Sequence, residues 1–255
     1  ERGVNLYLQK EGERARVIDL NINADYRFDP KEHKTYSSDI NEYKISPNGK
    51  LVALQIHGEI FVKELDKEKK RSVDVSGNSY RDKDMAWLND SVLLFTSDRE
   101  GQYDIYMVSS SDPDKHGLFE SLKHQVSRVT QTSQDESSLN ISPDGKQIAY
   151  IRGRGDLVVA NISASGVFSN ERILVSGWNE PSQLAWSPDS RYLAYSQEDL
   201  TFNPEVYIHA VDGKSDPVNV SMHPRGDYSP VWSADGSKLG FIPSRNNDDN
   251  DVWFV

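Results

Sequence analysis

The residues of this sequence that could take part in catalysis do not form a familiar catalytic pattern. No HExxH, GxSxG or SxxK motif occurs, and the six histidines lack the close spacing of metal ligands. The segment Asp212-Gly-Lys-Ser ends like a phosphate-binding loop but lacks the upstream glycine that such a loop needs. A Ser–His–acid triad would have to be assembled by the fold. We therefore predict no catalytic residue, no metal site and no cofactor in this chain.

Two acidic clusters contain the oxygen ligands that Ca²⁺ prefers, residues 246–251 (NNDDND) and residues 112–115 (DPDK). The ligand order and the glycine of an EF-hand are absent from both, so we interpret them as solvated loops. The segment Arg152-Gly-Arg-Gly contains only two arginines in an acidic protein, which favours a tight loop between strands over a nucleic-acid site.

The overall composition excludes several classes of function. The chain has 255 residues, with 29 Lys and Arg against 40 Asp and Glu, so its formal net charge is −11. Nucleic acids and anionic membranes need a basic face, so we expect neither as a partner. The lack of cysteine excludes disulfides, thiolate zinc sites and a cysteine nucleophile. No apolar run approaches the roughly 18 residues that span a bilayer, so we expect no membrane insertion. The start at Glu1, without a signal peptide, suggests a processed product or a fragment.

The residue types predict an all-β chain. Aromatic residues make up 10% of the sequence, with 12 Tyr, 8 Phe and 5 Trp, and such residues are typical of half-buried strands. The best helix candidate, residues 117–124 (GLFESLKH), is long enough for only about two turns.

One repeat recurs five times along the chain. Each copy has an apolar or Trp-ended strand, a turn like Ser-Pro-Asp-Gly and a second apolar strand. The pattern predicts a chain reversal, because Pro presets φ and Gly or Asn tolerates positive φ. The repeats are separated by 42, 54, 45 and 46 residues when they are aligned on Ile45, Trp87, Ile141, Trp186 and Trp232. The longest interval contains residues 109–125, which we interpret as an insertion.

Each repeat continues with an alternating third strand and a weaker fourth strand. Four antiparallel strands in roughly 40 to 50 residues are typical of a β-propeller blade. A β-sandwich or a solenoid would not explain five copies of one turn at one phase. We predict one β-propeller domain over residues 1–255, part of a six- or seven-bladed ring. Residues 1–20 would form the outer strands of an incomplete first blade, 21–42 a linker, and 43–255 five repeats, the last incomplete.

These motifs resemble the TolB-like propeller repeat, which occurs in TolB, in prolyl-oligopeptidase-type enzymes and in the tricorn protease. The residues that carry the resemblance are Ile45-Ser-Pro-Asn-Gly-Lys and His57-Gly-Glu-Ile-Phe-Val within Asn41–Leu65, followed by 82–87 (DKDMAW) and 97–106 (SDREGQYDIY). Their order is most similar to the start of a tricorn propeller, and the repeat covers most of residues 41–255.

The resemblance implies a propeller domain of a large serine peptidase. In such enzymes the propeller admits or holds peptides, while a separate tail-protease-like module with a PDZ domain cleaves them. This chain contains no counterpart of that module, so the resemblance implies an accessory domain with a catalytic module elsewhere in the same polypeptide.

The propeller topology predicts which loops would form a binding face. In each blade, the loop that enters the first strand and the loop that joins strands two and three share one face. The candidate peptide- or partner-binding residues in the entry loops are Arg81, Asp82, Asp135, Glu136, Trp178, Glu180, Arg225 and Asp227. Those in the second set of loops are His57, Arg99, Arg152, Arg154 and Arg245, and Glu198 lies in the same set. Arginines could hold a peptide's C-terminal carboxylate and acids its amine, or the loops are polar only because they are solvated.

Two groups of apolar residues need separate interpretations. Trp87, Trp186 and Trp232 share one repeat position, which predicts packing between blades. Trp178 lies outside that register, in the loop Gly177-Trp-Asn-Glu-Pro, and is a better candidate for contact with a ligand. The insertion contains a small apolar stripe that suggests either a docking point for another domain or a capped local helix: Leu118, Phe119 and Leu122.

Three functions remain open from the sequence. The first is peptide entry and handling as part of a tricorn-like peptidase. The second is a non-enzymatic TolB-like envelope propeller that binds a protein partner, and the third is the gating propeller of a prolyl-oligopeptidase-type enzyme. By analogy with such proteins we expect a periplasmic or secreted location, with the cytoplasm as the alternative.

Overall fold

The protein is all-β, as predicted. The computed structural model describes residues 6–18, 34–36, 38–244 and 251–255, and these contain strands and turns but no helix. The best helix candidate of the sequence, residues 117–124, does not form a helix. A single turn forms instead, in which the Ser121 amide donates to the Gly117 carbonyl at 3.0 Å, and a strand begins at His124.

The first three blades are four-stranded antiparallel sheets with the strands in sequence order. The first blade contains β3 (Ile40–Ile45), β4 (Leu51–Ile56), β5 (Glu59–Glu64) and β6 (Ser72–Asp74). The second contains β7 (Asp82–Asn89), β8 (Val92–Ser97), β9 (Asp104–Ser110) and β10 (His124–Arg128). The third contains β11 (Glu136–Ile141), β12 (Gln147–Arg152), β13 (Asp156–Ile162) and β14 (Phe168–Val175).

Two more blades and a small hairpin complete the described chain. The fourth blade contains β15 (Ser182–Trp186), β16 (Tyr192–Glu198), β17 (Pro204–Ala210) and β18 (Val218–Asn219). The fifth contains β19 (Asp227–Trp232), β20 (Leu239–Pro243) and β21 (Trp253–Phe254). Near the N-terminus, β1 (Tyr7–Leu8) and β2 (Arg16–Val17) pair only with each other.

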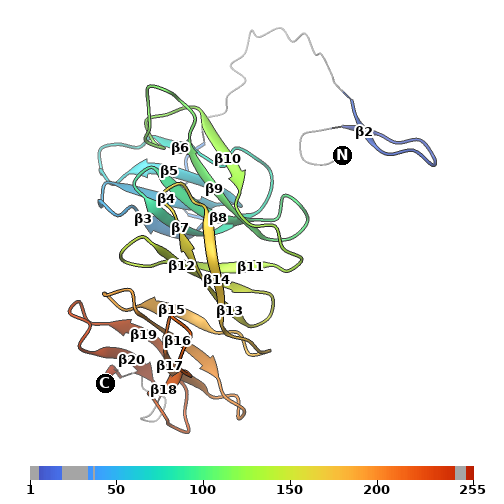
Figure 1. Ribbon diagram of the computed structural model, residues 1–255. Helices are drawn as coiled ribbons and strands as arrows, with labels where there is room; N and C mark the ends of the chain where they lie inside the picture. Colours follow the sequence, from blue (N-terminus) through green and yellow to red (C-terminus); the bar gives the residue numbers. More distant parts are fainter. Residues whose placement is uncertain (1–5, 19–33, 37, 245–250) are drawn as a thin grey trace.

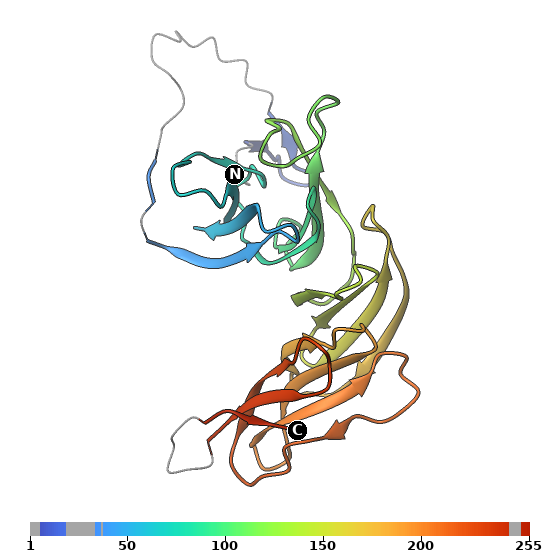
Figure 2. The same ribbon diagram turned by 90° about the vertical axis from the view of Figure 1, so that its left-hand side faces the viewer.

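The blades stack face to face in chain order (Figure 1). The first and fifth blades lie at opposite ends of the molecule in both views, so the five blades form an open row (Figure 2). The blade number of an intact ring and the division of the chain at residues 20 and 42 stay predictions. Most of the expected linker falls within residues 19–33, outside the described residues, and β3 begins at Ile40.

Every pair of neighbouring blades shares an apolar core. The four cores consist mainly of Val, Ile, Leu and aromatic side chains from the second and third strands of each blade. Alternation along each strand sends successive side chains to opposite faces, so each blade contributes to the core on both sides. Buried residues from the four cores, taken in chain order, are Ile60 with Phe95, Leu94 with Tyr150, Val159 with Tyr195, and Val206 with Phe241.

The tryptophans at the repeat position join neighbouring blades, as predicted. Each indole N–H donates to a backbone carbonyl in the innermost strand of the preceding blade. The bonds are Trp87 to Lys44 at 2.9 Å, Trp186 to Asn140 at 3.1 Å and Trp232 to Ala185 at 3.1 Å. The third blade has Ile141 at this position, so no indole joins it to the second blade.

A bulge recurs in the innermost strands of the second to fifth blades. At each bulge, two residues of the innermost strand lie opposite one aromatic residue of the second strand, and the first of the two has positive φ. These left-handed residues are Asp84 (51°), Ser138 (58°), Gln183 (55°) and Ser229 (57°). Neighbouring bulges are linked in one case, because the Ser229 amide donates to Gln183 Oε1 at 2.8 Å.

The insertion lies between β9 and β10, and its apolar residues do not form a common exposed stripe. Leu118 is fully buried in the core shared by the first and second blades, and Phe119 packs against that core. Only Leu122 is exposed. The insertion therefore contributes to the fold, and its three apolar residues form neither the docking stripe nor the local helix that the sequence left open.

Candidate binding site on the loop face

The two sets of loops predicted to share one face are hydrogen-bonded to each other. The Asp82 amide donates to the Gly58 carbonyl at 2.8 Å, and the Glu136 amide donates to the Tyr103 carbonyl at 2.7 Å. Each bond joins the entry of one blade to the second loop of the blade before it. The same kind of loop contact recurs between the third and fourth blades, where a Cβ atom at Gly155 would collide with the Gly177 carbonyl oxygen, so no larger residue fits there. We call this edge of the molecule the loop face.

Two of the predicted arginines on this face are paired with buried carboxylates of their own blade. Arg99 Nη2 lies 3.2 Å from Asp82 Oδ1, and Arg152 Nε lies 3.2 Å from Glu136 Oε1. Both arginine side chains are 16% exposed, and both carboxylates are fully buried. Buried charges of this kind need a partner, because an unpaired charge away from water is costly. These four residues therefore hold the ends of the strands together.

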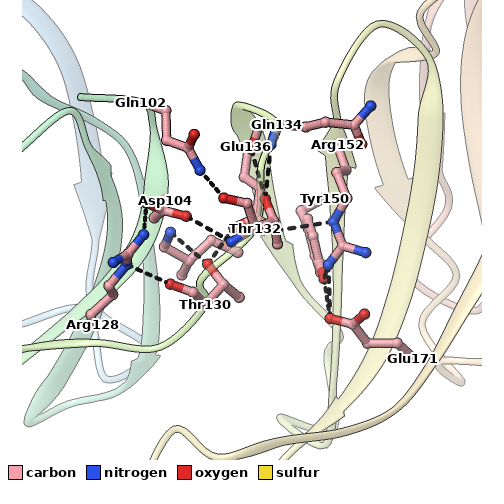
Figure 3. Close-up of polar contacts among 11 residues, drawn as sticks. Gln102, Asp104, Arg128, Thr130, Thr132, Gln134, Glu136, Tyr150, Arg152 and Glu171 are labelled. Carbon is pink, nitrogen blue, oxygen red and sulfur yellow. Dashed lines mark hydrogen bonds and ion pairs between the residues drawn. The ribbon is translucent and has the colours of Figure 1, made fainter. Parts of the chain in front are cut away.

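Arg152 is the centre of a larger polar network (Figure 3). Its Nη2 donates to the Tyr150 hydroxyl at 2.7 Å and to Glu171 Oε1 at 2.9 Å, and the Tyr150 hydroxyl donates to Glu171 Oε1 at 2.6 Å. Burial raises the pKa of Glu136 and of Tyr150. Burial also acts to raise the pKa of Glu171, but the hydrogen bonds from Arg152 and Tyr150 outweigh it and lower the pKa.

A second part of the network lies at the edge of the second blade (Figure 3). Arg128 Nη2 lies 2.6 Å from Oδ2 of the buried Asp104, and Arg128 Nε donates to the Thr130 carbonyl at 2.9 Å. The Thr130 hydroxyl donates to Glu136 Oε2 and accepts from the Ile105 amide at 2.9 Å. The network thus joins the second blade to the third, where no indole does. Sequence reasoning did not select Asp104 or Arg128, although an acid begins the third strand of each of the first three blades: Glu59, Asp104 and Asp156.

The other predicted residues fall into three groups. Asp227 is buried at the start of β19, and Asp135 anchors a loop, because its Oδ1 accepts from the Tyr103 amide at 2.9 Å. His57 is exposed and lies 5.5 Å from Tyr36, measured between ring centroids. The remaining exposed candidates are Arg81, Arg154, Trp178, Glu180 and Arg225. Arg245 and most of the acidic cluster 246–251 lie outside the described residues.

Trp178 forms an exposed aromatic pair on the loop face. Its indole is 66% exposed and meets the ring of Phe202 edge to face, with 6.0 Å between ring centroids. Phe202 belongs to the loop between β16 and β17, and Leu200 of the same loop is 90% exposed. We call Trp178, Leu200 and Phe202 the apolar patch. Sequence reasoning missed the last two, although an apolar pair inside a polar loop (EDLTFN) was a visible signal.

Asp199 holds the loop that presents this patch. Its Oδ1 accepts hydrogen bonds from the Thr201 amide at 2.7 Å, the Thr201 hydroxyl at 2.8 Å and the Asn203 amide at 3.1 Å. These hydrogen bonds lower the pKa of Asp199. Phe202 has φ of 62°, which is unusual for a bulky residue. Such strain persists only where the surroundings fix the conformation, so the loop is preorganised.

Two pockets adjoin Trp178 on the loop face. One has a volume of about 360 Å³ and is lined by Glu180, Ser182, Ser196, Glu198 and neighbouring residues. The other, of about 300 Å³, shares Trp178 and Glu198 with it and extends to Leu200. Ser196 is almost fully buried, and its hydroxyl has no hydrogen-bond partner within the described part of the chain. A buried hydroxyl without a partner in the wall of a pocket is a position where a ligand can bind.

A larger hollow on the opposite edge is a weaker candidate. It measures about 770 Å³ and lies between the third and fourth blades, near the turn at residues 142–145. Four of its five charged side chains already have partners: Lys214 lies 3.3 Å from Asp212, Arg172 donates to Gln147 and to the Val211 carbonyl, and Asp144 accepts from the Ser142 hydroxyl at 2.7 Å. Within residues 6–18, 34–36, 38–244 and 251–255, no cluster of His, Asp and Glu could hold a metal ion. Nor do these residues include a helix that could span a membrane.

No family model matches the sequence, and no curated protein matches it. Solved structures do. A protein assigned as TolB from Agrobacterium tumefaciens is similar over 84% of this chain and 75% of its own, with TM-score 0.58 and 20% identity. A puromycin-hydrolyzing peptidase from Mycobacterium tuberculosis is similar over 83% of this chain but only 35% of its own, with TM-score 0.60 and 13% identity. The β-propeller domain of Cps50 (Swd1) from Myceliophteria thermophila is similar over 89% of this chain and 75% of its own, with TM-score 0.60 and 10% identity.

These likenesses show the fold. The chain has a β-propeller fold like that of TolB, built from four-stranded antiparallel blades. The chain spans about a third of the length of the similar peptidase.

Proposed function

We propose that this chain is the propeller domain of a tricorn-like serine peptidase, in which it admits and holds peptides while a module elsewhere in the same polypeptide cleaves them. The observation that carries the proposal is the apolar patch with its two adjoining pockets on the loop face. The repeat motifs and the likeness to a peptidase structure support the peptidase context.

The chemistry of the site suits an extended peptide. A peptide needs an apolar contact for a side chain and a few polar groups that fix its orientation. Trp178 and Phe202 offer rigid aromatic surface, and Ser196 offers a hydroxyl in the wall of the adjoining pocket. Arg99 and Arg152 are held by their own carboxylates, so we assign the binding of peptides to Trp178 and its surroundings rather than to the whole set of loop arginines.

A second function is supported by the likeness to TolB. In that case the same loop face would bind a folded protein partner in the cell envelope, without a peptidase in the same polypeptide. The periplasmic or secreted location that we expect belongs to this proposal as well.

Peptide binding is the direct test. A mixture of short labelled peptides would be titrated with the wild-type protein and with Trp178→Ala, and binding would be followed by fluorescence anisotropy. Tyr43→Ala is a matched control, because Tyr43 is an equally exposed aromatic residue in β3 of the first blade. We expect the Trp178 variant to lose about tenfold in affinity, as is usual for a central aromatic contact, and the Tyr43 variant to lose none. Equal binding by all three proteins would refute the site.

The peptidase context is tested separately. The native gene product would be analysed by intact mass and by peptide mapping beyond Val255. A larger product that contains a tail-protease-like module supports the first proposal. A product without a protease module rejects it and favours the TolB-like alternative.

A further inference from the structure

We propose that the pocket beside Trp178 selects peptides with a cationic side chain, Lys or Arg, which it holds between the indole and two carboxylates. This inference rests on the proposed function and adds the class of substrate residue. It is carried by three features of one place in the fold: the charged lining, the unpartnered hydroxyl and the exposed indole.

The charged residues that line the two pockets are all acidic. They are Glu180, Glu198 and Asp199. Neither Glu180 nor Glu198 has a side-chain hydrogen bond or ion pair with any described residue, so both carboxylates are available to a ligand. Asp199 is not, because its carboxylate holds the loop. Arg154 and Arg225 lie in neighbouring loops on this face but line neither pocket.

The Ser196 hydroxyl adds a hydrogen-bond acceptor at the inner wall. It lines the pocket together with Ser182, which is paired with it across β15 and β16. The Ser182 hydroxyl donates to the Ser196 carbonyl at 3.4 Å, so it does not satisfy the Ser196 hydroxyl. An ammonium or guanidinium group carries several donors and no acceptor. Two carboxylates and one hydroxyl oxygen can accept those donors.

Trp178 suits the same ligand. The face of an indole attracts a cation that lies within about 6 Å of the ring, and Trp is the strongest of the aromatic side chains in this respect. The apolar stems of Lys and Arg also pack on aromatic surface while the charge stays near water. With a volume of about 360 Å³, the pocket is at the lower end of the range for ligand sites, which fits one side chain better than a folded segment.

The test compares peptides that differ only in one side chain. Blocked pentapeptides with a central Lys, Arg, Nε-acetyl-lysine or norleucine would be titrated by anisotropy with the wild-type protein. We expect the Lys and Arg peptides to bind about tenfold more tightly than the two uncharged ones. The double variant Glu180→Gln with Glu198→Gln should abolish that difference. The control Glu68→Gln with Glu120→Gln alters two exposed carboxylates away from the pocket and should keep it.

The outcomes separate this inference from the proposed function. If all four peptides bind equally and Trp178→Ala weakens all of them, the site binds peptides but the inference is wrong. If an unblocked peptide without Lys or Arg is preferred, the pocket takes an N-terminal amine and the inference is also wrong. If none of these peptides nor the mixed peptides bind, the proposed function fails together with it. Only a preference for Lys and Arg that depends on Glu180 and Glu198 supports it.

Discussion

At the scale of single residues, the loop face shows that equal charges can have unequal roles. Arg81 and Arg99 both belong to the loops that the sequence analysis selected, but Arg81 is exposed and Arg99 lies against the buried Asp82. A guanidinium that already neutralises a buried carboxylate has fewer N–H donors left for a ligand, and drawing it away would leave that carboxylate unpaired. The residue type therefore predicts which ligands an arginine can bind, and its contacts in the folded protein determine whether its donors are available for them.

We expect Arg99→Ala to reduce the free energy of unfolding by about 3 kcal/mol, because it leaves Asp82 buried without its counter-charge. Arg81→Ala, the matched control in the same region, should change it by less than about 0.5 kcal/mol. Urea unfolding followed by circular dichroism measures both. A near-neutral effect of Arg99→Ala would mean that the pair is not structural, and Arg99 would return to the set of candidate ligand-binding residues.

At the scale of the elements, each blade is joined to the next by a tryptophan or by a polar network. Trp186 illustrates the first kind of contact, since its indole is buried and its N–H donates to the Asn140 carbonyl of the preceding blade. The Arg152 network illustrates the second, at the junction where Ile141 replaces tryptophan. The junction between the second and third blades thus lacks the tryptophan hydrogen bond but has the polar network.

The Trp186 contact leads to a graded prediction. Trp186→Phe keeps an aromatic ring but removes the N–H and should cost about 1 kcal/mol. Trp186→Ala also leaves a cavity and should cost about 3–5 kcal/mol. The exposed Trp178→Phe should be close to neutral. The midpoints of urea unfolding order the three variants. Equal losses for the Phe and Ala variants at position 186 would show that the hydrogen bond, and not the packing, dominates.

The turns between the first and second strands predict a dependence on pH. Hydrogen bonds from Ser233 and from the amide and hydroxyl of Ser237 lower the pKa of Asp235 to about 2 from its ordinary value of 3.8. A lowered pKa in the folded state means that the ionised carboxylate stabilises the fold above about pH 4. That stabilisation is lost as the pH falls toward 2.

We expect an NMR titration of the Asp235 carboxyl to report a pKa of about 2. The difference in unfolding free energy between the wild type and Asp235→Ala should shrink as the pH falls from 4 to 2, because protonation removes the same hydrogen bonds from the wild type. An ordinary pKa near 3.8 would contradict the proposed turn geometry.

The sequence predicted the elements better than their irregularities. Regular alternation and the repeated Ser-Pro-Asp-Gly turn were sufficient for the strands, because both depend on local steric rules. The left-handed bulges at Ser138 and Gln183 were not predictable, because neither residue is a glycine and no local motif marks these positions. Leu118 was misinterpreted for a different reason. Its burial depends on the first blade, which is remote in the sequence.

At the scale of the whole molecule, the repeat predicted the propeller fold, but the loop face needed three-dimensional contacts. The pairing of Arg152 with Glu136 and Glu171 joins residues 16 and 19 positions away, and no local motif marks it. Trp178 stood out in the sequence because it broke the repeat. Its partner Phe202 did not, because the contact joins two loops of the same blade that are separated by two strands.

The net charge of the molecule predicts that the association of a basic peptide depends on salt. A formal charge of −11 attracts a basic peptide over a distance that shrinks with salt, from about 30 Å at 0.01 M ionic strength to about 8 Å at 0.15 M. We therefore expect the association rate of the Lys pentapeptide to fall by about tenfold over that range, while its dissociation rate changes little. The norleucine peptide should show no such fall.

Stopped-flow measurement of the association and dissociation rates also separates the long-range attraction from the contacts inside the pocket. The variant with Glu180→Gln and Glu198→Gln should mainly raise the dissociation rate, because it removes contacts inside the pocket and only two of the protein's 40 acidic side chains. An equal salt effect on the association rates of the Lys and norleucine peptides would mean that the net charge of the protein does not attract the cationic side chain.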